Sequence, residues 1–187
     1  MPGTVIGKSL NLGYAGKVSR NPYNQIRARF VKSVLNGSGV ETMSNVAFGS
    51  PIVLNTDNTV TAWKDVTPAI TSAAVFAGIA VSEVKQSMTL SYGANTAGGV
   101  YEPLMPADIL LSGNCTIICV EGTPLAGGAV YVTTVAGTTA ALGDFTATAT
   151  PAGAGTALLI PNMKWTSGKQ DSATGITEVT INYAVNP

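Results

Sequence analysis

The stretch Ile109-Leu-Leu-Ser-Gly-Asn-Cys-Thr-Ile-Ile-Cys-Val120 places two short apolar runs on either side of a polar break. Apolar runs of this length, bounded by turn residues, are typical of buried β-strands. Gly and Asn in the break favour a turn over a regular element. The stretch therefore predicts two buried strands, residues 109–111 and 115–120, which are split at residues 112–114.

The composition of the whole chain favours the same kind of structure. The 187 residues include 21 glycines and 10 prolines, and 45% are hydrophobic although only 6% are aromatic. Such a composition is typical of a turn-rich all-β protein. Only 11% of residues are charged, whereas soluble domains average about 25%. This low charge indicates that much of the surface is buried against partners; a surface rich in Thr, Ser and Asn is the alternative.

Strands and turns can be assigned along much of the chain. Residues 51–54 and 59–63 flank a polar turn and predict a hairpin. Residues 76–84 predict another strand, in which Gly78 permits a bulge or a close approach of backbones. Residues 67–75 could form one or two helical turns, with Pro68 at the first helical position.

The predicted domain organisation is an extended, basic N-terminal arm over residues 1–45 and a β-rich body over residues 46–187. The body is expected to be a small β-sandwich or barrel. Residues 49–54 resemble residues 128–133, so the body could consist of two related β units, 46–110 and 111–187. Chance similarity between strands rich in Gly, Val and Thr is the alternative.

Charge is divided by position along the chain. Residues 1–40 carry six basic side chains and no acidic one, a formal charge of +6, and the remaining residues carry −6. Such asymmetry predicts that the first segment docks on an acidic partner. Within it, Ile26, Ala28 and Phe30 alternate with Arg27 and Arg29, which predicts a strand with a basic outer face; a short helix that exposes both arginines is the alternative.

The sequence argues against catalysis and against a metal or cofactor site. It contains no histidine, which removes Ser-His-Asp and Cys-His arrangements and the commonest general base. The acidic residues are scattered singly, and the segment from Gly13 to Lys17 lacks the spacing of a phosphate-binding loop. Cys115 and Cys119 would lie about 13 Å apart on one face of a strand, too far for a disulfide. They are predicted to be buried thiols.

Other partner classes are less well supported. Arg27, Arg29 and Lys32 lie among aromatic residues, as in single-strand nucleic-acid binders, but the charge is sparse and the body is acidic. The longest near-apolar run, residues 69–81, is too short for a membrane helix. No signal peptide is recognised, so synthesis in a reducing cytoplasm is expected. We therefore predict no nucleic-acid and no membrane partner.

Several segments, in order, resemble the head decoration, or structural cement, proteins of tailed bacteriophages. The segment from Gly13 to Arg20 is similar to that family's Gly-Tyr-Pro-Gly-x-x-x-Arg, with Ala15 where Pro is usual. Tyr101-Glu-Pro103 is similar to its Tyr-x-Pro-Gly, with Leu104 in place of Gly. The other matching segments are Phe48-Gly-Ser-Pro-Ile-Val53, Phe76-Ala-Gly-Ile-Ala-Val-Ser-Glu-Val84, Gly113 to Val120, Gly128-Ala-Val-Tyr-Val132 and Asn162-Met-Lys-Trp165.

The resemblance implies a non-enzymatic virion protein that is made in the host bacterial cytoplasm and sits on the outer capsid surface. It implies contacts with the phage major capsid protein and with copies of itself, often as a homotrimer, and no catalytic, cofactor or metal residues. The candidate contact residues, to the capsid or between subunits, are Lys8, Tyr14, Lys17, Arg20, Tyr23, Arg27, Arg29 and Lys32. A tail or fibre module that binds a host glycan through Trp63 or Trp165 is the alternative, although core packing of both rings is favoured.

Overall fold

The fold was analysed in a computed structural model, which describes residues 12–19, 23–66, 70, 72, 75–82 and 99–182. Within this part of the chain the structure is all-β and includes a short 3-10 turn, η1 (Trp63–Asp65). The strands are β1 (Gln25–Phe30), β2 (Val46–Ala47), β3 (Pro51–Leu54), β4 (Val60–Ala62), β5 (Phe76–Val81), β6 (Val100–Tyr101), β7 (Pro106–Glu121), β8 (Ala129–Val135), β9 (Phe145–Thr146), β10 (Thr156–Gln170) and β11 (Ile176–Ile181).

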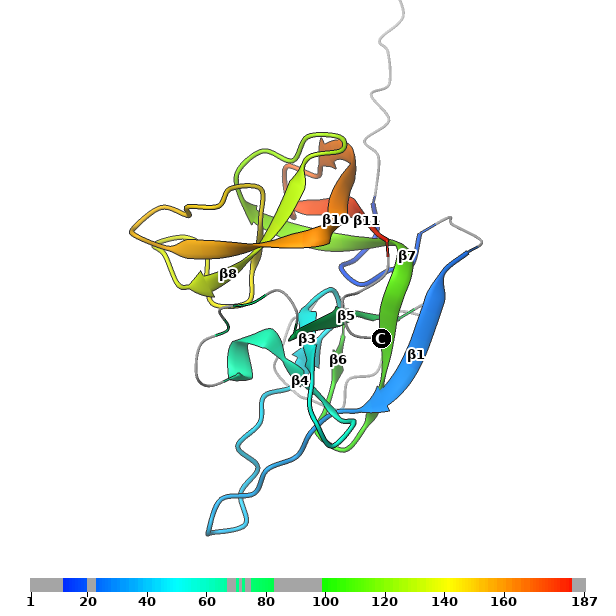
Figure 1. Ribbon diagram of the computed structural model, residues 1–187, viewed down its shortest axis with the longest axis vertical. Helices are drawn as coiled ribbons and strands as arrows, with labels where there is room; N and C mark the ends of the chain where they lie inside the picture. Colours follow the sequence, from blue (N-terminus) through cyan, green and yellow to red (C-terminus); the bar gives the residue numbers. More distant parts are fainter. Residues whose placement is uncertain are drawn as a thin grey trace, which may run out of the picture.

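The strand β7 connects the two halves of the molecule. It runs without interruption through residues 112–114, so the prediction of two separate strands was wrong. Gly113 bends the strand instead, at a φ of +126° that L-residues rarely adopt. A Cβ at this position would lie 2.0 Å from Asn24 Oδ1. Figure 1 shows β7 rising through one lobe and turning sharply into the other.

The first lobe is a barrel-like ring, called the first barrel below. Residues 106–112 of β7 pair with β1 on one side and with β5 on the other. Strand β5 then pairs with β3, and β3 with β4. A parallel bridge between Val31 and Val60 joins the end of β1 to β4 and closes the ring.

The second lobe, the second barrel, is built on residues 113–121 of β7. These residues pair with β11 on one side and, in parallel, with β9 on the other. Strand β10 links β11 to β8, and β8 pairs with β9, so the ring closes through backbone pairing. In Figure 1 this lobe carries β8, β10 and β11 and lies above the first barrel.

The sequence-based fold class is confirmed as all-β, with a barrel-like sheet. The hairpin is confirmed as β3 and β4. The prediction for Gly78 is also confirmed, because a Cβ there would lie 2.4 Å from the carbonyl oxygen of Leu110 in β7. Most of the helical turns predicted over residues 67–75, and the strand end at 83–84, lie outside the described residues. The division into an arm and two β units stays a prediction.

The buried core extends through both barrels. Its largest fully buried side chains include Trp63 and Phe76 in the first barrel and Trp165 in the second. The rings of Trp63 and Phe76 pack edge to face, with centroids 6.5 Å apart. Aromatic side chains of this size bury large apolar areas, so the two tryptophans hold the core of their respective barrels.

Candidate functional site

The described residues that were predicted to contact a partner lie on the first barrel and on the segment that precedes it. This segment, called the N-terminal approach, comprises residues 12–19, 23 and 24. Lys8 and Arg20 lie outside the described residues. Tyr23 is 82% exposed immediately before β1, and the Lys17 side chain is exposed as well. The contact of these side chains with a partner stays a prediction.

Strand β1 carries Arg27 and Arg29 at the outer margin of the first barrel (Figure 1). The strand is confirmed, so the helical alternative is excluded. Its inward and outward faces were only partly predicted. Ile26 packs on the core, but Phe30 is 60% exposed and Arg29 is half-buried. Among the described residues β1 pairs only with β7, so it is an edge strand of the sheet.

Lys32 is already engaged within the chain. Its Nζ lies 3.5 Å from Asp57 Oδ2 in the turn between β3 and β4. The hydroxyl and N–H of Thr59, together with Lys32, lower the pKa of the Asp57 carboxyl. Because both side chains are partly exposed, the pair contributes little stability. The ion pair neutralises the charge of Lys32, which was predicted to contact an acidic partner.

Tyr14 and its neighbours are bound to the body where the two barrels meet. The Tyr14 hydroxyl donates to the carbonyl oxygen of Ser82 at 3.0 Å. The Thr116 hydroxyl of β7 donates to the carbonyl of Tyr14 at 2.5 Å, and the N–H of Gly16 donates to the carbonyl of Thr116 at 2.6 Å. These bonds give Tyr14 a structural role in fixing the N-terminal approach against β7.

A hairpin projects from the first barrel after β1 and is called the finger here (residues 33–43; Figure 1, blue to cyan). The Glu41 carboxylate organises its base by accepting bonds from the Ser33 hydroxyl and from the N–H groups of Val34 (2.9 Å), Thr42 (3.0 Å) and Met43 (2.8 Å). The Ser33 bond, followed by those from Met43 and Val34, lowers the pKa of Glu41 to about 2.

Glu41→Gln is expected to loosen the finger without unfolding the barrels. The three N–H groups share Glu41 Oε1, and the Ser33 hydroxyl bonds the other oxygen. Glutamine keeps one neutral oxygen, which accepts weaker bonds than a carboxylate, and its NH2 group cannot accept from Ser33. Exchange of the amide protons of Val34, Thr42 and Met43 should therefore accelerate about tenfold or more. Because the folded-state pKa is lowered, the same contribution is present above the usual pKa of 4.5 and lost as pH falls through about 2. Hydrogen exchange followed residue by residue tests this. Unchanged exchange at the three amides would contradict it, and Glu178→Gln in the second barrel is the control.

A group of exposed apolar side chains, which sequence reasoning missed, lies at the far end of β1. The tip cluster, as we call it, consists of Phe30, Leu104 and Met105, which are 60%, 71% and 46% exposed. Leu104 has a φ of +68°, a conformation that costs an L-residue about 1–2 kcal/mol. One sequence signal pointed here, because Leu104 stands where the resembling family has Gly.

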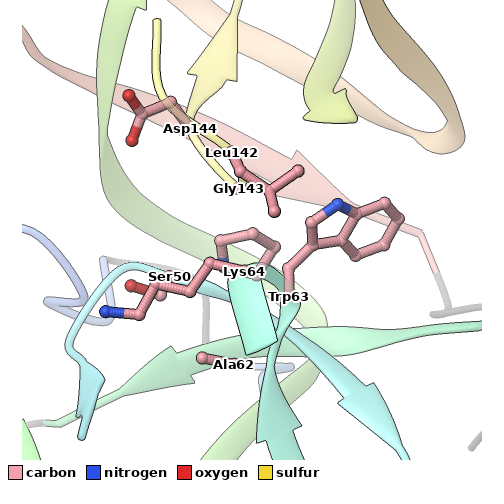
Figure 2. Close-up of a pocket in the computed structure, with 8 residues that line it drawn as sticks. Ser50, Ala62, Trp63, Lys64, Leu142, Gly143 and Asp144 are labelled. Carbon is pink, nitrogen blue, oxygen red and sulfur yellow. The ribbon is translucent and has the colours of Figure 1, made fainter. Parts of the chain in front are cut away.

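A small pocket lies between the barrels. Figure 2 shows Ser50, Trp63 and Lys64 of the first barrel facing Leu142, Gly143 and Asp144 of the second. Its volume is about 160 Å³. Burial raises the pKa of Asp144, opposed by the N–H of Ala141. Trp63 is only 1% exposed, so its ring cannot stack on a sugar. The polar side chains that line the pocket are those of Ser50, Lys64 and Asp144.

The tryptophans and the cysteines are buried. Trp165 is also 1% exposed, which confirms that both tryptophans belong to the core. Cys115 and Cys119 are confirmed as free, buried thiols, and burial raises the pKa of Cys119 to about 11. The described residues contain no group of three or more His, Cys, Asp or Glu side chains that could hold a metal ion. No helix in the described part of the chain is long and apolar enough to cross a membrane.

Two barrels that share one strand, with a projecting finger and exposed basic and apolar side chains, define a structural scaffold. A comparison with known proteins identifies the family of this chain. The family model of the structural cement protein (E217 gp24/Pam3 gp6) matches residues 1–182. The chain belongs to this family of phage capsid proteins, which places it in the virion, on the capsid.

A solved structure, the capsid of Myoviridae phage XM1, contains a chain with a similar fold. The TM-score is 0.57 and the sequence identity is 16%, over 97% of this chain and 98% of that one. At this identity the likeness concerns the fold, and it extends over both barrels. No curated protein matches the chain.

Proposed function

We propose that this chain is a non-enzymatic cement protein that binds the outer surface of a phage capsid and stabilises contacts between copies of the major capsid protein. The observation that carries the proposal is the family match over residues 1–182. The exposed contact residues of the first barrel and the low charge of the chain support it, because stable assemblies deplete charge in their interface cores.

The basic residues provide the electrostatic part of the contact. Arg27 and Arg29 belong to no ion pair among the described residues, whereas Lys32 is paired with Asp57. We propose that both arginines and Lys17 meet acidic groups of the capsid or of a neighbouring copy, in a homotrimer. A few complementary charges are enough to steer such an encounter and to fix its register. The glycan-binding alternative is not favoured, because both of its candidate tryptophans are buried.

Sedimentation of the purified protein with undecorated capsids tests the proposal. The protein is expected to pellet with the capsids in a saturable ratio and to raise the temperature at which filled capsids release DNA. A chain that begins at residue 12 keeps every described residue and tests the contribution of Lys8. Full-length protein that stays in the supernatant at all concentrations would contradict the proposal.

A further inference from the structure

We propose that the tip cluster inserts into an apolar depression on the capsid surface, and that Leu104 is kept there at the expense of the chain's own stability. The inference rests on the proposed function, because it takes the capsid as the partner. The inference specifies the end of the molecule that faces the capsid. It also specifies the side chains that enter the contact.

The three side chains of the tip cluster come from neighbouring backbone. Phe30 lies opposite Pro106 in the pairing of β1 with β7. One residue further along, the N–H of Val31 donates to the carbonyl of Met105 at 2.9 Å, and the N–H of Leu104 donates to the carbonyl of Val31 at 2.9 Å. The three residues are therefore neighbours on one hydrogen-bonded backbone support, and the side chain of each is exposed.

Leu104 is the residue that folding alone does not explain. Its positive φ suits glycine and strains leucine. A strained residue can be compensated when its side chain is buried, but 71% of Leu104 remains exposed. Within the described residues, the strain is therefore not offset by burial of the side chain. A persistent strain of this kind indicates a functional constraint, and an exposed leucine supplies an apolar contact to a partner.

The surroundings of the tip cluster define the chemistry of that partner. Arg27 and Arg29 alternate with Ala28, so both project from one face of the strand pair, while Ala28 and its partner Asp108 project from the other. Glu102 and Asp108 are exposed as well. The matching surface is an apolar depression that offers carboxylates along the arginine face and fewer of them on the side of Asp108.

We favour the capsid over a second copy of the chain as the partner, because this end of the molecule carries most of the exposed large apolar side chains. The finger ends there too (Figure 1), and its Leu35 and Val40 are 62% and 58% exposed. The exposed apolar residues of the second barrel, by contrast, lie on separate elements: Ile118, Leu125, Val135 and Leu159. A protein that associates with a capsid needs one face of this kind, and the tip provides it.

Leu104→Gly separates stability from attachment. Removing the strain should raise the midpoint of thermal unfolding by roughly 2 °C, after allowance for the entropy of glycine. Losing the leucine from the contact should weaken capsid binding about tenfold or more. Ala154→Gly is the matched control, because Ala154 also has a positive φ, +64°, and is exposed in the second barrel. It should raise the midpoint similarly and leave binding unchanged.

Binding isotherms with undecorated capsids, thermal unfolding and the mass of the free protein are measured for the wild type, both glycine variants and Phe30→Ser. Weaker binding by Leu104→Gly and Phe30→Ser, but not by Ala154→Gly, supports the inference. Equal binding by all variants overturns it while the proposed function stands. A smaller mass of Leu104→Gly in solution with unchanged capsid affinity makes a second copy the occupant and overturns it as well. Wild-type protein that does not bind overturns both proposals.

Discussion

Gly78→Ala is expected to destabilise the protein by at least about 3 kcal/mol, which for a chain of this size lowers the midpoint of thermal unfolding by roughly 10 °C. Two independent causes act together. The φ of Gly78 is +142°, which L-residues rarely adopt. The new Cβ would also lie 2.4 Å from the Leu110 carbonyl oxygen and 2.8 Å from Ile109 Cγ2. The first of these is backbone of β7, which cannot move without disturbing both barrels.

Two other glycines allow the causes to be separated. Gly127 has a positive φ, but a Cβ added there would meet nothing within 4 Å, and Gly37 has neither feature. Gly127→Ala should therefore cost about 1 kcal/mol from strain alone, and Gly37→Ala should cost nothing measurable. Thermal and denaturant unfolding of the three variants provide the comparison. A loss for Gly78→Ala no greater than that for Gly127→Ala would show that the backbones of β5 and β7 do not approach closely at this position.

The double variant Arg27→Glu/Arg29→Glu is expected to weaken capsid attachment at least about tenfold, since like charges brought together at an interface cost several kcal/mol. Both side chains lie on a strand margin, so the barrel itself should remain folded. Attachment of the wild type should also weaken as salt is raised, because partly exposed charges are screened.

A matched control is available in the second barrel. Lys164 and Lys169 are exposed on β10, so Lys164→Glu/Lys169→Glu changes the net charge by the same amount at the opposite lobe. Attachment by this control should remain close to that of the wild type. If both double variants lose attachment equally, the effect comes from net charge and the assignment of the contact to β1 is wrong.

Much of the local structure could be predicted because its causes lie close together in the sequence. The hairpin β3–β4 follows from two apolar runs around a polar turn. The break at residues 112–114 was misinterpreted because a glycine that ends a strand and a glycine that bends it look alike in sequence. The difference comes from Asn24, whose side chain occupies the space beside Gly113, and from strands β1 and β11, which continue the pairing on either side of the bend.

The proposed contact surface was also harder to predict, because its geometry depends on residues that are distant in sequence. Residues 1–45 were predicted to form an extended basic arm. Within this segment Lys32 pairs with Asp57 of the adjacent β3–β4 turn, and the Tyr14 hydroxyl donates to the carbonyl of Ser82. Both partners are distant in sequence, so composition could not reveal them. The tip cluster depends on three residues that only the pairing of β1 with β7 brings together. Its one sequence signal was Leu104 at a position where the resembling family has glycine.

A density map of capsids prepared with and without the protein tests the central claim most directly. Additional density is expected on the outer surface, over contacts between major capsid subunits. The β1 end of the first barrel and the finger should lie against the shell, and the second barrel should lie away from it. Absence of additional density, density on the inner surface, or attachment through the second barrel would rule out the proposed mode of attachment.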